Sequence, residues 1–326
     1  MKKIFKWGLI LAFGGLILLI FGLVGHGNQS VYFEGAKPVL NSEQKRYAKT
    51  YQVKNPQQLN FLLNQTYMGK KCFAKISLEI RTGAKFSVKY VGDRKNAPVI
   101  KEKDGVLTVY ATQGDKPKSN VNFTWNDRQM HVDENRLIVT VPDKASYQKV
   151  HLEGINADLN AKGITTAKLE MMACDADADF QKVTAKQLTL KSSESDLKMV
   201  NSTLENGTII LGDGDLKTIN SQLKQVSIKT SEGDLTLNNS GLTACNLKAD
   251  EGDITANQLD VKGKSSLTSQ TGDITVVSGQ IQGYVLQNGV GDNQFQGQKV
   301  ARKFNKKANL ADILYVTDDM GDINIQ

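Results

Sequence analysis

A column of regularly spaced aspartates is the feature of this sequence that comes nearest to a chemical site. From residue 150 onward they recur every 19 residues, with one interval of 20 and one of 30, as Asp158, Asp177, Asp196, Asp215, Asp234, Asp253, Asp273, Asp292 and Asp322. If the repeats stack, the carboxylates line up and could chelate Ca²⁺, which takes about six to eight oxygens. The candidates for such a metal column are Asp215, Asp234, Asp253 and Asp273. The favoured interpretation is that each aspartate caps backbone N–H groups at its own turn, because calcium-binding solenoid repeats are nonapeptides.

Further acids accompany this column and raise the question of catalysis. Pairs two residues apart recur in successive repeats, namely Asp213 with Asp215, Glu232 with Asp234, and Glu251 with Asp253. A polysaccharide-cleaving β-helix needs paired carboxyl groups with tuned pKa values. Sugar-binding faces usually carry aromatic platforms, whereas residues 151–300 contain only Phe180, Tyr284 and Phe295, all at inward positions. The pattern favours a solvated acidic strip, and we assign no catalytic residue.

The histidines and cysteines give no metal or cofactor site. His26, His131 and His151 lack the spacing of a zinc-binding motif. Cys245 takes an inward position and is interpreted as a small apolar side chain. For Cys72 and Cys174, unpaired thiols are favoured, with a disulfide bridge as the alternative. We therefore predict no cofactor.

The residues around each aspartate predict strands. Apolar residues stand eight and six positions before it and one and three positions after it, as Val226, Ile228, Leu235 and Leu237 do around Asp234. They alternate with polar residues, which is typical of strands with one buried face. A glycine commonly precedes the aspartate, and we expect it to provide the positive φ of a tight corner.

Two short strands and two corners in 19 residues describe one coil of a β-solenoid. A single coil cannot bury its apolar side, but stacked coils share one core. We predict an all-β protein, a single-stranded parallel β-helix of about nine 19-residue coils. At a coil spacing of about 4.8 Å it would be on the order of 40 Å long. The absence of proline after Pro142 agrees with a ladder that needs every N–H donor.

The chain before residue 150 divides into three parts. Residues 71–149 contain strand-like runs, which we interpret as a β-rich N-terminal cap that covers the first coil, so that cap and solenoid form one domain over 71–326. Residues 26–70 are interpreted as a stalk or linker. Within it, Asn55-Pro56 could begin a short helix, while the alternation of Leu59, Phe61 and Leu63 indicates a strand instead.

The N-terminus carries a membrane signal. Trp7–Val24 is a run of 18 residues without a charge, preceded by Lys2, Lys3 and Lys6. A helix of about 20 apolar residues spans a bilayer, and flanking lysines stay in the cytoplasm. Residues 1–25 therefore predict one N-terminal transmembrane helix with the rest of the chain outside the cell membrane. A cleaved secretory signal is the alternative, and it would also export the domain.

Charge is unevenly distributed and suggests partners. Residues 1–150 hold 24 Lys and Arg against 11 Asp and Glu, whereas residues 151–300 hold 13 against 19. The basic half could contact anionic lipid, anionic envelope polymers or another membrane protein. No nucleic-acid recognition module is present, so nucleic acid is not an expected partner.

Several motifs occur in a familiar order. They are Tyr47-Ala48-Lys49-Thr50-Tyr51, then Ile76–Val91, then Arg136–Pro142, then repeats of G-D-[LI]-x-[LVA]. In this order the chain resembles the bacterial putative-adhesin family, whose members are membrane-anchored β-solenoids often found beside cell-envelope-stress regulators in Gram-positive bacteria. The resemblance covers roughly residues 45–326 and implies a single-pass extracytoplasmic protein without assigned catalytic residues. The chain departs from the family pattern at Leu59–Cys72 and by an insertion near Gly297–Ala308.

Together these features predict a non-enzymatic, membrane-anchored, extracytoplasmic β-solenoid. It would act as an interaction, adhesion or stress-related scaffold of the cell envelope. The alternative is a β-helix protein that binds or cleaves an envelope glycan, and a third interpretation is a regulatory partner of another membrane protein.

Overall fold

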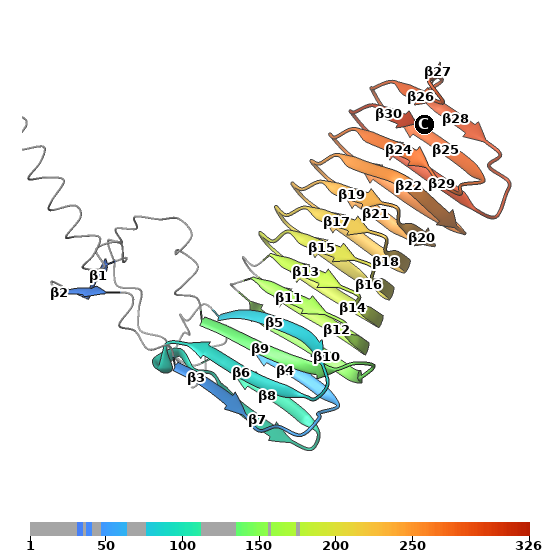
Figure 1. Cartoon of the computed structure of the whole chain (residues 1–326). Helices are drawn as coiled ribbons and strands as arrows, with labels where there is room; N and C mark the ends of the chain where they lie inside the picture. Colours follow the sequence, from blue (N-terminus) through green and yellow to red (C-terminus); the bar gives the residue numbers. More distant parts are fainter. Residues whose placement is uncertain are drawn as a thin grey trace, which may run out of the picture. The chain divides into compact units, whose positions relative to one another are not determined.

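The computed structural model of the chain describes residues 31–34, 37–40, 47–63, 76–111, 135–155, 158–173 and 177–326. The chain divides into two compact units, one made of residues 1–47 and 115–134, the other of residues 48–114 and 135–326. In the first unit an antiparallel hairpin joins β1 (Val31–Glu34) to β2 (Lys37–Leu40). The second unit contains the predicted solenoid, whose coils lie side by side in Figure 1.

The predicted membrane segment Trp7–Val24 lies outside the described residues, as do His26, Cys72, His131 and Cys174. Within the described ranges, no helix has both the length and the apolar character needed to cross a bilayer. The turn at Arg94–Asn96 is a 3-10 helix of three residues.

The repeats form the predicted coils, each with strands on two faces of one continuous sheet. Face I contains β10 (Ser146–Ile155), β12 (Thr165–Ala173), β14 (Thr184–Ser192), β16 (Thr203–Leu211), β18 (Gln222–Thr230), β20 (Gly241–Thr243), β21 (Asn246–Ala249) and β23 (Lys264–Ser269). Face II contains β11 (Leu159–Lys162), β13 (Ala178–Gln181), β15 (Leu197–Val200), β17 (Leu216–Ile219), β19 (Leu235–Asn238), β22 (Ile254–Lys262) and β24 (Ile274–Ser278). The last three residues of β22 continue onto face I, where they pair with β20. Neighbouring coils pair in parallel on both faces.

The register follows the 19-residue period, so equivalent apolar residues stack. Leu197 of β15 pairs with Leu216 of β17, and both side chains are buried. The residues predicted to point inward do so, with 2% or less of Leu190, Ile209 and Leu247 exposed. This shared apolar interior supplies the stabilisation that one coil alone would lack.

Two further coils precede the repeats. β4 (Gln58–Leu62) pairs in parallel with β10, and β5 (Ile76–Gly83) pairs in parallel with β11. Leu59 and Phe61 are completely buried, so the alternation indicated a strand correctly and no helix begins at Asn55-Pro56. Together with β3 (Tyr47–Tyr51), β4 shows that residues 47–63, which the sequence assigned to the linker 26–70, carry strands of the folded sheet.

At both ends the coils are not stacked in chain order. β8 (Val106–Tyr110) and β9 (Asn135–Pro142) pair with the free edges of β4 and β5, so the β4–β5 coil lies between the β8–β9 coil and the first repeat. At the other end, β29 (Ile313–Asp318) lies between β23 and β25 (Gly283–Asn288), and β30 (Ile323–Ile325) lies between β24 and β26 (Asn293–Phe295). The ninth repeat is therefore inserted between the seventh and the eighth.

Antiparallel strands cover the two outermost coils. β6 (Ser87–Gly92) and β7 (Val99–Lys103) pair with β9 and β8, which confirms the predicted β-rich cap. The insertion near Gly297–Ala308 forms the second cap, in which β27 (Gln298–Val300) and β28 (Lys303–Lys306) pair with β26 and β25. These strands carry exposed lysines, a common protection of sheet edges against association.

Candidate functional site

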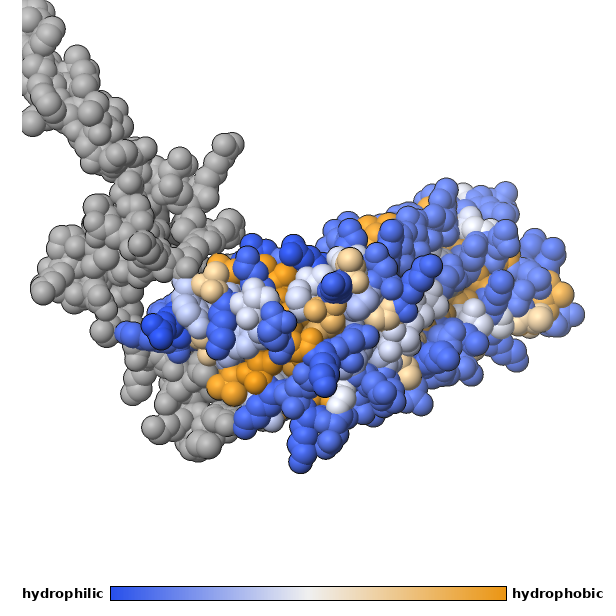
Figure 2. Space-filling model, turned by 60° about the horizontal axis from the view of Figure 1, so that its bottom comes forward, coloured by the Kyte–Doolittle hydropathy of each residue, from blue (hydrophilic) through white to orange (hydrophobic). Residues whose placement is uncertain are grey.

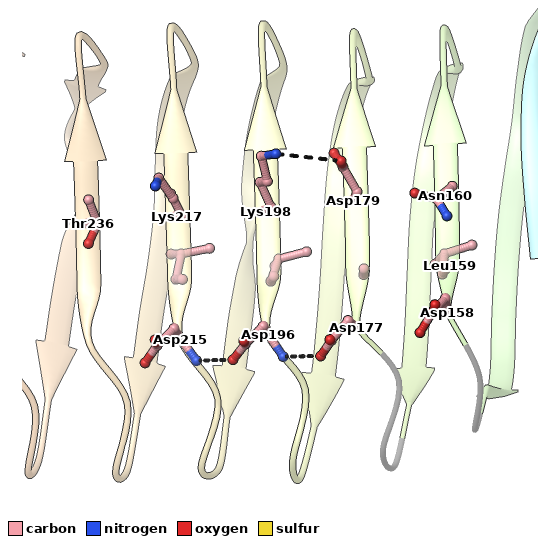
Figure 3. A pocket seen from close by; sticks show the side chains of 13 residues that line it. Asp158, Leu159, Asn160, Asp177, Asp179, Asp196, Lys198, Asp215, Lys217 and Thr236 are labelled. Carbon is pink, nitrogen blue, oxygen red and sulfur yellow. Dashed lines mark hydrogen bonds and ion pairs between the residues drawn. The ribbon is translucent and has the colours of Figure 1, made fainter. Parts of the chain in front are cut away.

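The register aspartates form a ladder along the corner where face I turns into face II, which we call the aspartate corner. In each link, Oδ1 of one aspartate accepts a hydrogen bond from the backbone N–H of the register aspartate in the next coil (Figure 3). The donor–acceptor distance is 3.1 Å from Asp196 to Asp177 and 2.9 Å from Asp215 to Asp196. It is 2.8 Å in the remaining links, which run from Asp215 through Asp234, Asp253, Asp273 and Asp322 to Asp292.

The ladder confirms that these carboxylates cap backbone amides, but it corrects which amides they cap. In every link from Asp177 to Asp292 the carboxylate binds the N–H of the neighbouring coil and not one in its own turn. The reason is geometric, because the stacked corner brings the next amide within reach of the side chain at every step. The side chains thus add hydrogen bonds between coils at the corner, after the face I strand has ended and before the face II strand begins.

The four aspartates of the calcium interpretation, Asp215, Asp234, Asp253 and Asp273, are consecutive members of this ladder and are exposed. In the described part of the chain, no group of three or more His, Cys, Asp or Glu side chains is placed to hold a metal ion.

Beside the ladder runs the predicted acidic strip, which we define as Asp213, Glu232 and Glu251 together with the neighbouring ladder aspartates. All three side chains are exposed. The surface visible in Figure 2 is mostly hydrophilic, with apolar side chains confined to narrower stretches. The strip therefore presents negative charge on three successive coils.

A groove of about 480 Å³ lies over face II beside the aspartate corner. Its lining comes from β11, β13, β15, β17 and β19 and includes Asp158, Asn160, Asp177, Asp179, Asp196, Lys198, Asp215, Lys217 and Thr236 (Figure 3). On its floor, Nζ of Lys198 lies 3.8 Å from Oδ2 of Asp179. The groove thus offers charged and hydrogen-bonding groups of both signs, while Asp177, Asp196 and Asp215 already bind the backbone amides of the next coil.

The aromatic residues of the repeats confirm their predicted inward positions. Phe180, Tyr284 and Phe295 are 1%, 6% and 8% exposed, so none of them forms a platform on which a sugar ring could stack. Phe295 instead packs edge-on against Tyr284, with ring centroids 5.3 Å apart.

A charged cluster on face I was not singled out from the sequence. Nδ1 of His151 lies 3.0 Å from Glu170, and its Nε2 lies 3.1 Å from Glu153. Nζ of Lys149 and Nζ of Lys168 approach the two carboxylate oxygens of Glu170 at 2.7 and 2.5 Å. The sequence does contain a signal for this cluster. His151 and Glu170 are 19 residues apart, which places them on neighbouring coils.

The two lysines make the carboxyl group of Glu170 more acidic. Hydrogen bonds from Lys149 and Lys168 lower the pKa of Glu170 to about 2, against the opposing effect of burial. The carboxylate stays ionised and acts as a link between β10 and β12, which leaves it unsuited to act as a general acid.

Cys245 is buried, as predicted for a small apolar side chain. Burial raises the pKa of its thiol, and its Sγ donates to the carbonyl of Leu223 at 3.2 Å. Both features make it a structural residue and not a reactive one.

Comparison with known proteins identifies a family. The family model described as Toastrack DUF4097 matches residues 73–326. A putative adhesin from Bacteroides fragilis NCTC 9343 is 12% identical, and the similarity covers 87% of this chain and 98% of that one with a TM-score of 0.45. A putative lipid binding protein from Parabacteroides distasonis ATCC 8503 is also 12% identical, with the same coverage and a TM-score of 0.48. No curated protein matches the chain.

Proposed function

The chain belongs to the Toastrack DUF4097 family, and from this membership and its repeat surface we propose that it is a non-enzymatic scaffold of the cell envelope. In this proposal the solenoid displays the acidic strip to a partner at a fixed position. Adhesion to an envelope component and a role in the envelope-stress response are both forms of this display function.

The observation that carries the proposal is that the ladder carboxylates accept hydrogen bonds from backbone amides. A catalytic pair needs a carboxyl group free to exchange a proton with substrate. Asp177, Asp196 and Asp215, which line the groove, are instead engaged with backbone amides at 2.8–3.1 Å. Such repetition supports a structural role for the ladder and a display role for the neighbouring exposed acids.

The location is proposed from the sequence. The uncharged run Trp7–Val24 with Lys2, Lys3 and Lys6 before it supports a single-pass anchor with a cytoplasmic N-terminus. The described domain would then lie outside the cell membrane. The basic residues of the first 150 positions favour contact with anionic lipid, an anionic envelope polymer or another membrane protein.

The test uses the full chain in its native membrane. Chemical crosslinking in intact cells is compared between the natural chain and a variant with Asp213→Asn, Glu232→Gln and Glu251→Gln. We expect crosslinked complexes to fall at least about tenfold, with an unchanged melting temperature. A matched control replaces the exposed Lys186, Lys224 and Lys262 with Gln on another edge of the coils and should retain the complexes.

Two results would contradict the proposal. One is equal crosslinking by the natural chain and the acid-neutralised variant. The other is release of new reducing ends when the purified full chain is incubated with envelope polysaccharide, which would support the glycan-cleaving alternative. Protease added to intact cells tests the location, because an outward-facing domain must be cut while the cells remain closed.

A further inference from the structure

Buried polar side chains inside the aspartate corner occupy one equivalent position of the repeat and share a hydrogen-bonding pattern. The position concerned lies four residues before the register aspartate. Its buried polar members Thr230, Ser269, Asn288 and Asp318 are all 5% or less exposed, while Ser192 at the same position is half-buried. We call the residue directly before a register aspartate the corner glycine, since it is glycine in each of these four coils. Any hydrogen-bonding atom here must find its partner within the protein.

Three of the four side chains donate to the preceding coil. Oγ1 of Thr230 donates to the carbonyl of the preceding corner glycine at 3.2 Å, and Oγ of Ser269 does so at 3.1 Å. Nδ2 of Asn288 makes the same bond at 2.8 Å. The two hydroxyls also accept from the N–H of their own corner glycine, at 3.1 and 3.0 Å. The feature that Thr230, Ser269 and Asn288 share is donation to the preceding corner glycine, since Oδ1 of Asn288 is buried without a hydrogen-bond partner.

Asp318 occupies this position at the end of β29, in the inserted C-terminal repeat. Its Oδ1 accepts from the N–H groups of Gly321 and Met320 at 2.8 and 3.1 Å. Its Oδ2 is buried and has no hydrogen-bond partner. The preceding corner glycine in space is Gly272, because β29 and β30 pair with β23 and β24. An ionised carboxylate would place two acceptors in a position where the equivalent residues donate.

We propose that Asp318 is protonated in the folded protein and that its Oδ2–H donates to the carbonyl of Gly272. The proton comes from water, and the neutral carboxyl then completes the bond that Thr230, Ser269 and Asn288 make. It fastens the inserted β29–β30 segment to the coil before it.

The surroundings of this carboxyl favour the neutral form. Burial raises the pKa of Asp318, hydrogen bonds from Gly321 and Met320 act in the opposite direction, and the charges of Asp273 and Asp319 raise it further. The acid on the other side, Asp292, lies 2.7 Å from Nζ of Lys299. A second cation at this corner, Arg302, donates to the carbonyls of Gly289 and Val290.

A proton held in this way makes the C-terminal insertion sensitive to pH. Because the pKa of Asp318 is raised on folding, its contribution to stability is complete below the unfolded value of about 3.9. That contribution is lost as pH rises through the folded pKa, since the charged form then lacks a partner. The distal end should loosen on the alkaline side of that transition.

The test compares the full chain with Asp318→Asn, which keeps the shape and can donate as Asn288 does, and with Asp319→Asn as a matched removal of charge. Amide hydrogen exchange of β29 and β30 is followed as a function of pH. We expect protection in the natural chain to fall about tenfold for each unit by which the folded pKa exceeds the ordinary one. In Asp318→Asn protection should be independent of this titration. Asp319→Asn should keep the titration but move it to lower pH, because the charge of Asp319 helps to raise the pKa of Asp318.

Infrared difference spectra of the natural chain minus Asp318→Asn provide the second measurement, because a protonated carboxyl has its own carbonyl band. We expect that band to persist at pH values where an ordinary aspartate, with a pKa of about 3.9, is already ionised. A carboxyl that is fully ionised at that pH, or a loss of protection in Asp318→Asn at every pH, would overturn the proposal. If the variant does not fold, carboxyl ¹³C titration of Asp318 in the natural chain decides by itself.

Discussion

At the residue scale, close stacking explains the corner glycines. A Cβ on Gly214 would lie 1.9 Å from the carbonyl oxygen of Ser195, and one on Gly233 would lie 2.1 Å from that of Gly214. Neither glycine has a positive φ, so the reason expected from the sequence was wrong. Positive φ occurs instead at the opposite corner, where Asn220 and Asn239 adopt 50° and 47°. Asparagine tolerates that region better than most residues.

This close contact predicts that Gly233→Ala is destabilising. The added methyl group must push neighbouring coils apart at the backbone, and overpacking of this kind costs about 1–3 kcal/mol. Urea unfolding followed by circular dichroism measures the change. Ser227→Ala, at an exposed position of the same coil, is the control and should leave stability nearly unchanged. Equal stability of both variants would show that the corner can relax.

At the element scale, side chains on the outer faces add links between neighbouring strands. The carboxylate of Glu170 on β12 binds Lys149 and His151, both on β10. Lys168 of its own strand holds the other oxygen. Such a network joins two coils outside the core, where the flanking side chains still contact water.

Glu170→Gln should therefore lower stability at neutral pH, by about 1 kcal/mol, as is usual for partly exposed ion pairs. The pKa of Glu170 is lowered on folding, so its contribution is present above the unfolded value of about 4.3. It is lost as pH falls through about 2. Urea unfolding of both chains over a pH series should show the difference shrinking in that range. A difference that does not depend on pH would point to altered packing, and Glu205→Gln serves as the comparison.

At the scale of the whole molecule, both ends of the solenoid are closed by insertion. The β4–β5 coil and the β29–β30 coil each lie one place inside the outermost coil. The outermost coils are in turn covered by antiparallel strands. A parallel edge that would accept another chain is thereby covered at each end.

The inserted position of the β29–β30 coil predicts that deleting it exposes the segment that precedes it in the chain. Deleting residues 313–326 removes β29 and β30 and leaves β25 and β26 without their parallel partners. We expect rapid proteolysis within residues 279–312, detected by mass spectrometry of the fragments. Deletion of Gln326 alone is the control and should preserve protection. If residues 279–312 stay protected in the longer deletion, the β25–β26 coil must be able to pair directly with β23 and β24.

The structure of a single coil could be predicted from the sequence. The alternation around Asp234 places Ile228 and Leu235 inside, and both side chains are 1% or less exposed. The same period placed the aspartates in one column. These features are local, since period and alternation decide which side of a strand each residue faces.

The order in which the coils stack could not be predicted from the sequence. Every parallel edge offers the same backbone groups and similar apolar rows, so local pattern does not distinguish Asp322 from Asp292 as the neighbour of Asp273, and the structure places Asp322 there. Local pattern also does not reveal which amide each ladder carboxylate binds, or that Asp318 is buried between two coils. Neighbour choice depends on the packing of whole coils and on the loops between them, which no single repeat encodes.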